Sequence, residues 1–151
     1  WDIIKEQFDL DMDNIPGSGA AGGLGTALMV FLNGTLKSGI ETVLDLVDFD
    51  EHLKDVDIVV TGEGATDWQS VFGKVMQGVG VHCKKHHIPA VAIIGSMGSG
   101  AEDIFDYGIE SIITTVNNIM PLSDALNHAE ELYLGAARRM FRLLKAGMQM
   151  R

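Results

Sequence analysis

The chain has 151 residues, a formal net charge of −10 and an apolar fraction of 46%. This length suits a single domain with a buried core, and the apolar content excludes a disordered chain. No apolar run reaches the roughly 20 residues that span a bilayer, and the excess of acids disfavours binding to a nucleic-acid backbone. The single cysteine, Cys83, cannot form an intramolecular disulfide, and we identify no secretory leader. We therefore expect a cytoplasmic protein that binds neither nucleic acid nor membrane.

The first third of the sequence predicts a loop followed by two helices. Residues 9–16 are acidic and end in a proline, which favours an extended backbone before it. Residues 22–32 place apolar side chains at helical spacing, namely Leu24, Leu28 and Phe31 or Leu32. Ser38 and Glu41 match a capping box and predict that a second helix begins there. The inward face of that helix would carry Ile40, Val43, Leu44 and Val47.

Three β-rich runs follow an acidic link at residues 48–57. They cover residues 58–61, 90–94 and 111–116, and each is apolar throughout. Continuous apolar runs are typical of parallel strands that helices cover on both faces.

Helical patterns alternate with these runs. A stripe of Val75, Val79 and Cys83 lies between the first two runs. A longer helix is expected after the third run, over residues 126–144, with Ser123 as its N-cap. The order of strand, loop and helix predicts an α/β fold: a doubly wound parallel sheet with helices on both faces.

Two glycine-rich loops are candidates for anion binding. Residues 17–25 contain the pattern G-x-G-x-x-G, but no strand precedes it, which disfavours a nicotinamide or flavin site. Backbone N–H groups of this loop and the following helix could instead form an anion cradle. The glycines could equally serve close packing. Residues 95–100 follow a predicted strand and could bind an anion or simply connect strand to helix.

The segment from Glu63 to Lys74 concentrates chemically active groups directly after a predicted strand. Phosphoryl transfer needs carboxylates that hold magnesium, a cation that faces the phosphates, and an acceptor for the attacking hydroxyl. Asp67 could take the substrate proton or orient the metal, Glu63 is a second carboxylate, and Lys74 could contact phosphate. Gln69 and Ser70 could orient polar oxygens. The alternative is structural: Glu63 satisfies turn amides, Asp67 caps a turn, and Lys74 is solvated.

His82 and His86 lie four residues apart on a predicted helix and could bind zinc. A third ligand is not apparent. Residues 84–87 are therefore better interpreted as a solvated, cationic helix end.

These segments together resemble a known family. The glycine-rich residues 17–25, the segment 39–45, the turn 61–64 with its following polar residues, and the segment 89–95 have the order and spacing of the bacterial glycerate kinase family, specifically the class I glycerate 2-kinases. The resemblance runs through essentially the whole chain. It matches only the C-terminal portion of the family sequence.

The resemblance implies a fold and a reaction. The fold would be flavodoxin-like, or Rossmann-like, and incomplete relative to the family, whose members insert a second α/β domain. Residues 1–56 would hold the glycine-rich loop and helices at the domain junction, and residues 57–151 the C-terminal part of the flavodoxin-like domain. The reaction would be transfer of the γ-phosphate of ATP to D-glycerate, with Mg²⁺, to give 2-phosphoglycerate.

The resemblance also favours specific site residues. The catalytic set would be Asp67, Glu63 and Lys74, with Asp67 and Glu63 also holding Mg²⁺. Substrate or nucleotide binding would involve Gly17, Ser18, Gly19, Gly22, Gly23, Gly62, Gly64, Gln69 and Ser70.

Two positions depart from the family pattern. Ala65 stands where the family usually has an arginine, and Met76 where it usually has a proline. Alanine cannot replace a bidentate anion clamp. The alternative is thus a non-catalytic, flavodoxin-like ligand-binding or interaction domain, inactive alone. The opening strand of the family is also expected to be missing, so an exposed sheet edge predicts self-association or pairing with the missing N-terminal portion.

Overall fold

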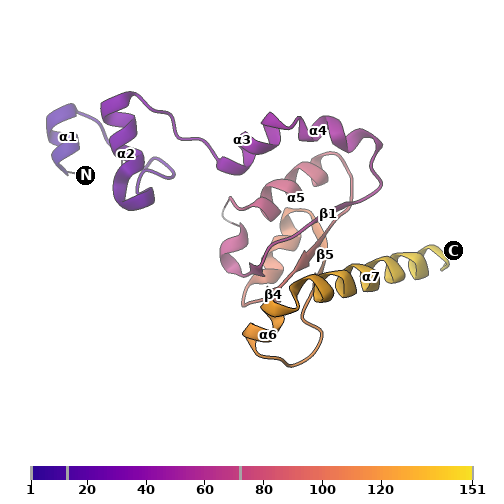
Figure 1. The fold of residues 1–151 in the computed structure, drawn as a ribbon. Coiled ribbons are helices and arrows are strands. Elements are labelled where there is room, and N and C mark those ends of the chain that lie inside the picture. Colours follow the sequence, from indigo (N-terminus) through magenta and orange to yellow (C-terminus); the bar gives the residue numbers. More distant parts are fainter. Residues whose placement is uncertain (1, 13, 72, 151) are drawn as a thin grey trace. The chain divides into compact units, whose positions relative to one another are not determined.

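The structure, a computed structural model, describes residues 2–12, 14–71 and 73–150. The chain forms two compact units, Trp1–Ser38 and Gly39–Arg151 (Figure 1). The boundary between them falls directly before the helix that the capping box at Ser38 predicts.

The first unit consists of α1 (Asp2–Phe8) and α2 (Ala20–Leu32). The two helices meet where the rings of Phe8 and Phe31 pack edge to face, with their centroids 5.5 Å apart. Regular helix begins only at Leu24, because Ala21, Gly22 and Gly23 have positive φ angles of 50°, 68° and 91°. The predicted helix is confirmed. Its apolar face is nevertheless exposed, with Leu24, Leu28, Phe31 and Leu32 between 41% and 71% accessible.

The second unit is built on a parallel sheet with strand order β1-β3-β5. The strands are β1 (Val59–Thr61), β3 (Ala90–Ile94) and β5 (Ile109–Thr114). The register pairs Thr61 with Ala92 and Ile94 with Thr114. All of β3 is buried, whereas β1 and β5 are partly exposed. The three predicted strands and their parallel arrangement are confirmed.

Helices cover both faces of this sheet, as the sequence predicts. On one face, α3 (Gly39–Leu46) and α5 (Val75–Lys85) contribute Leu44, Met76, Val79 and Cys83 to a core with Ala90, Ala92 and Ile94. On the other face, α7 (Ala129–Met148) packs Ala136 and Met140 against Val91 and Ile93. The alternating inward and outward side chains of β3 therefore feed two separate cores.

Several local predictions were wrong. Val43 and Val47 are exposed rather than inward, because only Leu44 and part of Ile40 face the core. Val75 is likewise 52% exposed, and the adjacent Met76 takes the buried position. The acidic link, for which no helix was predicted, contains α4 (Phe49–His52) and the 3₁₀ turn η1 (Leu53–Asp55). The helix between β3 and β5 is a 3₁₀ helix, η3 (Ala101–Tyr107).

The C-terminal helix is broken in two. The segment α6 (Leu122–Asn127) has Pro121 as its N-cap, and His128 separates it from α7. Ser123 is therefore not the cap. It lies inside α6, and its hydroxyl bonds to the carboxylate of the next residue, Asp124, at 3.3 Å.

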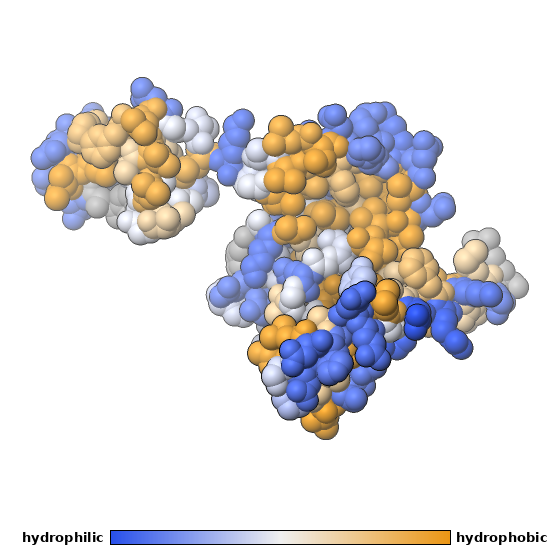
Figure 2. Space-filling model, in the orientation of Figure 1, coloured by the Kyte–Doolittle hydropathy of each residue, from blue (hydrophilic) through white to orange (hydrophobic). Residues whose placement is uncertain are grey.

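Apolar side chains gather at the surface of each unit (Figure 2). In the second unit they include Ile119, Leu122 and Leu126 near α6. Across the part of the chain that is described, none of the helices combines the length and the hydropathy that a bilayer crossing requires.

Candidate functional site

The candidate site lies at the carboxyl edge of the parallel sheet. Because β1, β3 and β5 run in the same direction, the loops after Thr61, Ile94 and Thr114 emerge at one edge. Open α/β sheets bind their ligands at this edge. A cleft of about 390 Å³ opens here, and its walls include Glu63, Gly95 and, from α7, Tyr133.

Two buried hydroxyl groups hold the Glu63 carboxylate. Ser70 Oγ donates to Glu63 Oε1 at 2.6 Å, and Thr66 Oγ1 donates to the same oxygen at 2.9 Å. Thr66 and Ser70 are both completely buried, and Thr66 Oγ1 also lies 3.4 Å from Met76 Sδ. Glu63 Oε2 has no such bond to a described residue, so one carboxylate oxygen is fixed and the other is available. Thr66 was not among the predicted site residues. Its position three residues after Glu63 is typical of a local turn and could have indicated this contact.

Asp67 caps the next turn, as the structural alternative predicts. Its Oδ1 accepts from the Gln69 N–H at 2.9 Å, and its carbonyl oxygen accepts from the Ser70 N–H at 2.9 Å. These bonds begin the 3₁₀ turn η2 (Trp68–Val71). The residue Asp67 is half-buried, and its Oδ2 is outside these bonds. A capping role for one oxygen leaves the second for a ligand.

Lys74 lies at the N-cap of α5 and is half-buried. Its ammonium makes no ion pair with the residues that the structure describes, and neither Glu63 nor Asp67 is its hydrogen-bond partner. The structure thus brings Glu63, Asp67 and Ser70 together and leaves Lys74 outside this network. The side chain of Gln69 is exposed, and only its backbone N–H joins the turn.

The second glycine-rich loop runs alongside the Glu63 turn. Gly95 N–H donates to the Glu63 carbonyl at 3.2 Å, and Gly98 N–H donates to the Thr66 carbonyl at 2.7 Å. A second parallel pair results, β2 (Ala65–Thr66) with β4 (Ser96–Met97). The loop is therefore part of the wall of the site.

Two positions in these loops require glycine because the neighbouring backbone approaches them closely. A Cβ at Gly62 would lie 2.1 Å from the Ile93 carbonyl oxygen, and one at Gly95 would lie 2.2 Å from the Gly64 carbonyl oxygen. Both contacts are far inside van der Waals distance. Gly64 differs, since a Cβ there would meet no described atom within 4 Å.

The first glycine-rich loop combines packing with unusual backbone geometry. Gly25 is a packing position, because its Cβ would lie 2.9 Å from the Gly17 carbonyl oxygen. Gly22 and Gly23 have open space around them and are required by their positive φ angles instead. The buried Ser18 is fixed through its carbonyl oxygen, which accepts from Thr26 Oγ1 at 3.0 Å. That this loop shares a ligand with Glu63 and Asp67 remains a prediction.

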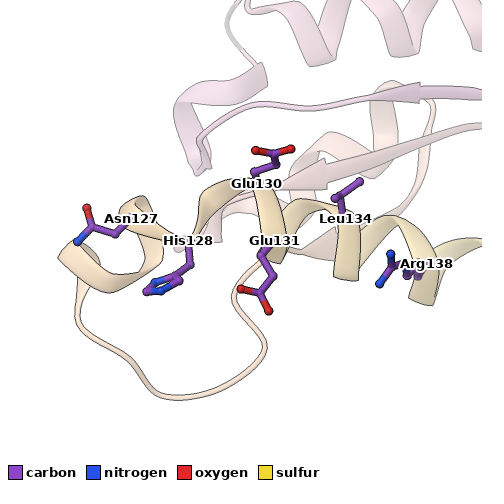
Figure 3. Close-up of a pocket in the computed structure, with 6 residues that line it drawn as sticks. All are labelled: Asn127, His128, Glu130, Glu131, Leu134 and Arg138. Atoms are coloured by element: carbon purple, nitrogen blue, oxygen red, sulfur yellow. The ribbon is translucent and has the colours of Figure 1, made fainter.

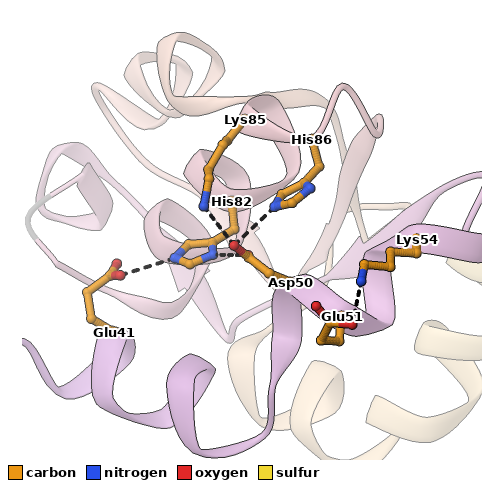
Figure 4. Close-up of polar contacts among 7 residues, drawn as sticks. All are labelled: Glu41, Asp50, Glu51, Lys54, His82, Lys85 and His86. Atoms are coloured by element: carbon orange, nitrogen blue, oxygen red, sulfur yellow. Dashed lines mark hydrogen bonds and ion pairs between the residues drawn. The ribbon is translucent and has the colours of Figure 1, made fainter.

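His82 of α5 and His86 at the C-cap of this helix form a polar cluster around Asp50 (Figure 4). His82 Nδ1 bonds to Asp50 Oδ1, and its Nε2 lies 3.1 Å from Glu41 Oε2. Lys85 Nζ donates to Asp50 Oδ2 at 2.7 Å, and His86 Nε2 lies 3.0 Å from that oxygen without hydrogen-bond geometry. Among the residues described, no three His, Cys, Asp or Glu side chains are arranged to hold a metal ion. His82 is only 15% exposed, and its two bonds tie α5 to α3 and α4.

This cluster shifts the pKa values of its members. Lys85, His82 and His86 hold the pKa of Asp50 well below its usual value. Burial opposes protonation of His82, but its bonds to Asp50 and Glu41 outweigh this and raise its pKa above 6.5. Burial, with a smaller contribution from the Asp50 charge, raises the pKa of the Cys83 thiol to about 11. Cys83 is therefore an unreactive core residue.

Comparison with known proteins identifies the family. The sequence model described as the glycerate kinase family matches residues 1–145. The chain is 43% identical to a glycerate kinase of Halalkalibacterium halodurans over 91% of this chain and 36% of that protein. It is 38% identical to a glycerate 2-kinase of Escherichia coli over 98% of this chain and 39% of that protein.

A solved structure supports the same assignment. A Salmonella typhimurium protein assigned as glycerate kinase 2 superposes with a TM-score of 0.71 at 36% identity, over 99% of this chain and 38% of its own. The chain thus spans 36–39% of the length of these relatives. The predicted α/β fold, incomplete relative to the family, is confirmed. The chain belongs to the glycerate kinase family and corresponds to a C-terminal portion of it.

Proposed function

We propose that a family-length protein carrying this sequence transfers the γ-phosphate of ATP to D-glycerate and yields 2-phosphoglycerate. Family membership supports the reaction class. The observation that carries the assignment to this region is the pair of carboxylates at the carboxyl edge of the sheet. Glu63 and Asp67 each have one oxygen fixed by the turn and a second oxygen outside it.

These carboxylates fit Mg²⁺ in their donor chemistry. Magnesium prefers oxygen ligands, keeps several waters, and is usually held by one or two carboxylates together with substrate phosphates. Glu63 and Asp67 supply that number of carboxylates. When bound, the ion would neutralise charge on the transferring phosphate.

The remaining residues have roles in binding and proton movement. Asp67 Oδ2 accepts the proton of the attacking hydroxyl or orients the metal, and Lys74 contacts phosphate from the N-cap of α5. Backbone N–H groups of residues 17–23 bind an anionic group, as helix N-termini and left-handed turns do. Gly62 and Gly64 keep the turn close to the ligand. Gln69 orients polar oxygens of the ligand, and the buried Ser70 orients the Glu63 carboxylate that meets it.

Asp67→Asn tests this assignment. Asn keeps the oxygen that accepts from the Gln69 N–H, so the turn should fold normally. Loss of the base or metal-orienting carboxylate should lower kcat by about 10²–10⁴-fold in a coupled assay on the family-length protein. Asp57→Asn, at an exposed position before β1, is the matched control. Near-normal turnover of Asp67→Asn would remove Asp67 from the chemistry.

One observation favours a second function, a non-catalytic ligand-binding or interaction domain. Ala65 is an exposed residue of β2 and places no cation beside Glu63. Calorimetry of this chain with MgATP, MgADP and D-glycerate distinguishes the kinase function from the non-catalytic one. Heat of binding for a nucleotide supports the kinase site, and heat for none of the three supports the scaffold.

A further inference from the structure

We propose that the cleft between the loop at residues 115–121 and the helices α6 and α7 binds the nucleoside part of a nucleotide. This inference rests on the proposed function and extends it to a site that lies outside the Glu63 turn. The cleft has a volume of about 600 Å³. An adjoining hollow of about 390 Å³ shares its helical wall, including His128, Glu131 and Arg138 (Figure 3).

Hydrogen bonds fix both walls of this nucleoside cleft. At the end of β5, Arg139 Nη2 from α7 donates to the Thr114 carbonyl at 2.9 Å, and Thr114 Oγ1 donates to the Val116 carbonyl at 3.2 Å. On the helical side, His128 Nδ1 donates to the Asp124 carbonyl at 2.9 Å across the break between α6 and α7. The loop and the helices are thus held before a ligand arrives, which lowers the entropic cost of binding.

The lining of the cleft suits a neutral, polar heterocycle with hydroxyl groups. Asn117 and Asn118 carry side-chain amides, and these form no hydrogen bond with the described residues, so their donors and acceptors are available to a base edge. Ile119, Met120, Pro121 and Leu132 add apolar surface for the flat face of a base.

Charge in the cleft argues against phosphate as its occupant. Asp124 and Glu131 line it together with the single guanidinium of Arg138. Two carboxylates repel a triphosphate but accept hydrogen bonds from ribose hydroxyls or an exocyclic amine. Figure 3 shows His128 and Glu131 pointing to the same side of the helix, away from Glu130. His128 and Glu131 therefore present their polar groups from one side of the helix, where a single ligand can meet both.

Neighbouring residues of one loop and one helix border the Glu63 cleft and the nucleoside cleft. Thr115 and Tyr133 line the Glu63 cleft, whereas residues 117–121 and Leu132 line the nucleoside cleft. The same loop and the same helix therefore border both. An extended nucleotide would place its phosphates near Glu63 and Asp67 and its base near Asn117.

Chemical-shift mapping of the ¹⁵N-labelled chain tests this placement with adenosine, inorganic triphosphate and ATP, each with Mg²⁺. We expect adenosine to shift resonances of residues 117–121 and 128–138, triphosphate to shift those of residues 62–74 and 95–100, and ATP to shift both sets. The double variant Asn117→Ala with Asn118→Ala should weaken ATP binding about 5- to 20-fold and leave triphosphate binding unchanged. Gln149→Ala, an exposed amide at the end of α7, is the control and should alter neither.

The outcomes separate the two proposals. Suppose that triphosphate and ATP shift the resonances of residues 62–74, while adenosine shifts only resonances outside residues 117–138. The assignment of the nucleoside cleft is then wrong, and the phosphate assignment stands. If adenosine shifts residues 117–138 but triphosphate leaves residues 62–74 unchanged, the phosphate assignment fails alone. Absence of shifts with all three probes overturns both.

Discussion

At the scale of single residues, the Glu63 turn is organised by buried hydroxyl groups. A carboxylate that accepts two hydrogen bonds on one oxygen loses the freedom to rotate, so its other oxygen points in one direction. This arrangement gives Ser70 and Thr66 a positioning role. A ligand would contact the free oxygen of Glu63 and not the hydroxyl groups behind it.

Ser70→Ala should therefore destabilise the second unit and loosen Glu63. The substitution removes the 2.6 Å bond to Glu63 and a 3.3 Å bond that Ser70 Oγ accepts from the Asp67 N–H. Because Ser70 is completely buried, we expect a loss of about 1–3 kcal/mol in the free energy of unfolding, measured with urea. Ser96→Ala, an exposed position in β4, should change it by less than about 0.5 kcal/mol. Equal stability of the Ser70 variant and the parent would show that these bonds contribute nothing.

The Asp50 cluster predicts a pH dependence of stability. The raised pKa of His82 means that its contribution is complete below 6.5 and is lost as pH rises through the higher folded-state value. The lowered pKa of Asp50 means that its contribution is complete above 3.8 and is lost as pH falls toward the lower folded-state value. Between these limits the cluster binds α5 to α3 and α4 most strongly.

His82→Gln should remove the loss of stability that the parent shows as pH rises above 6.5. Since hydrogen bonds to charged groups contribute about 1.5–3 kcal/mol and the partners are partly exposed, we expect about 1–2 kcal/mol less stability at pH 5.5. The difference from the parent should shrink as pH rises above 6.5. Thermal and urea unfolding from pH 4.5 to 8.5 measures it, with His87→Gln, an exposed neighbour, as the control. A constant difference at every pH would mean that the substitution at His82 disturbs packing alone.

At the scale of elements, the turns that follow β1 and β3 pack closely against neighbouring backbone because they carry glycine at the points of contact. Gly62→Ala would force a Cβ to 2.1 Å from the Ile93 carbonyl oxygen, so β1 and β3 must separate at their carboxyl ends. We expect a loss of about 1–3 kcal/mol, typical of overpacking, with lower ligand affinity. Gly64→Ala, two residues away with open space around it, should retain both stability and secondary structure. Comparable losses in the two variants, measured by circular dichroism and urea, would contradict the close-approach argument.

The sequence predicted the elements that have a strong local pattern. The apolar runs at residues 58–61 and 90–94 and the capping box at Ser38 all correspond to observed strands and a helix, because period and capping are local properties. The pairing of β2 with β4 was not predicted. Each strand has only two residues, and their partners lie about 30 positions apart in the chain.

Tertiary contacts decided the features that the sequence did not reveal. Asp50 and His82 are 32 positions apart, so spacing on one helix could not identify them as partners. The apolar face of α2 predicted burial, yet it is exposed in its unit, because a helical period indicates a face and not what covers it. The Glu63 turn was predicted as a site from its residue types, and only the structure shows the buried hydroxyl groups that hold it.

At the scale of the whole molecule, the sheet has two open edges. The three-stranded order leaves β1 and β5 each with one side unpaired among the strands that the structure describes. Unpaired N–H and C=O groups pair readily with another strand. Exposed apolar residues near the β1 edge, including Val60 at 40% accessibility, add to this tendency.

This chain should therefore self-associate at micromolar concentration. Size-exclusion chromatography with light scattering should give a mass above the 16.3 kDa of one chain. Val60→Lys places a charge on β1 at an exposed position, where lysine is known to block edge pairing, and should return the mass to that of a monomer without loss of helical signal. Leu143→Lys, a comparable change on an exposed face of α7, should leave the association intact. If the parent chain is a clean monomer at these concentrations, the open edges are protected by their own geometry. If both variants are monomeric, the contact runs through apolar side chains and not through the strand edge.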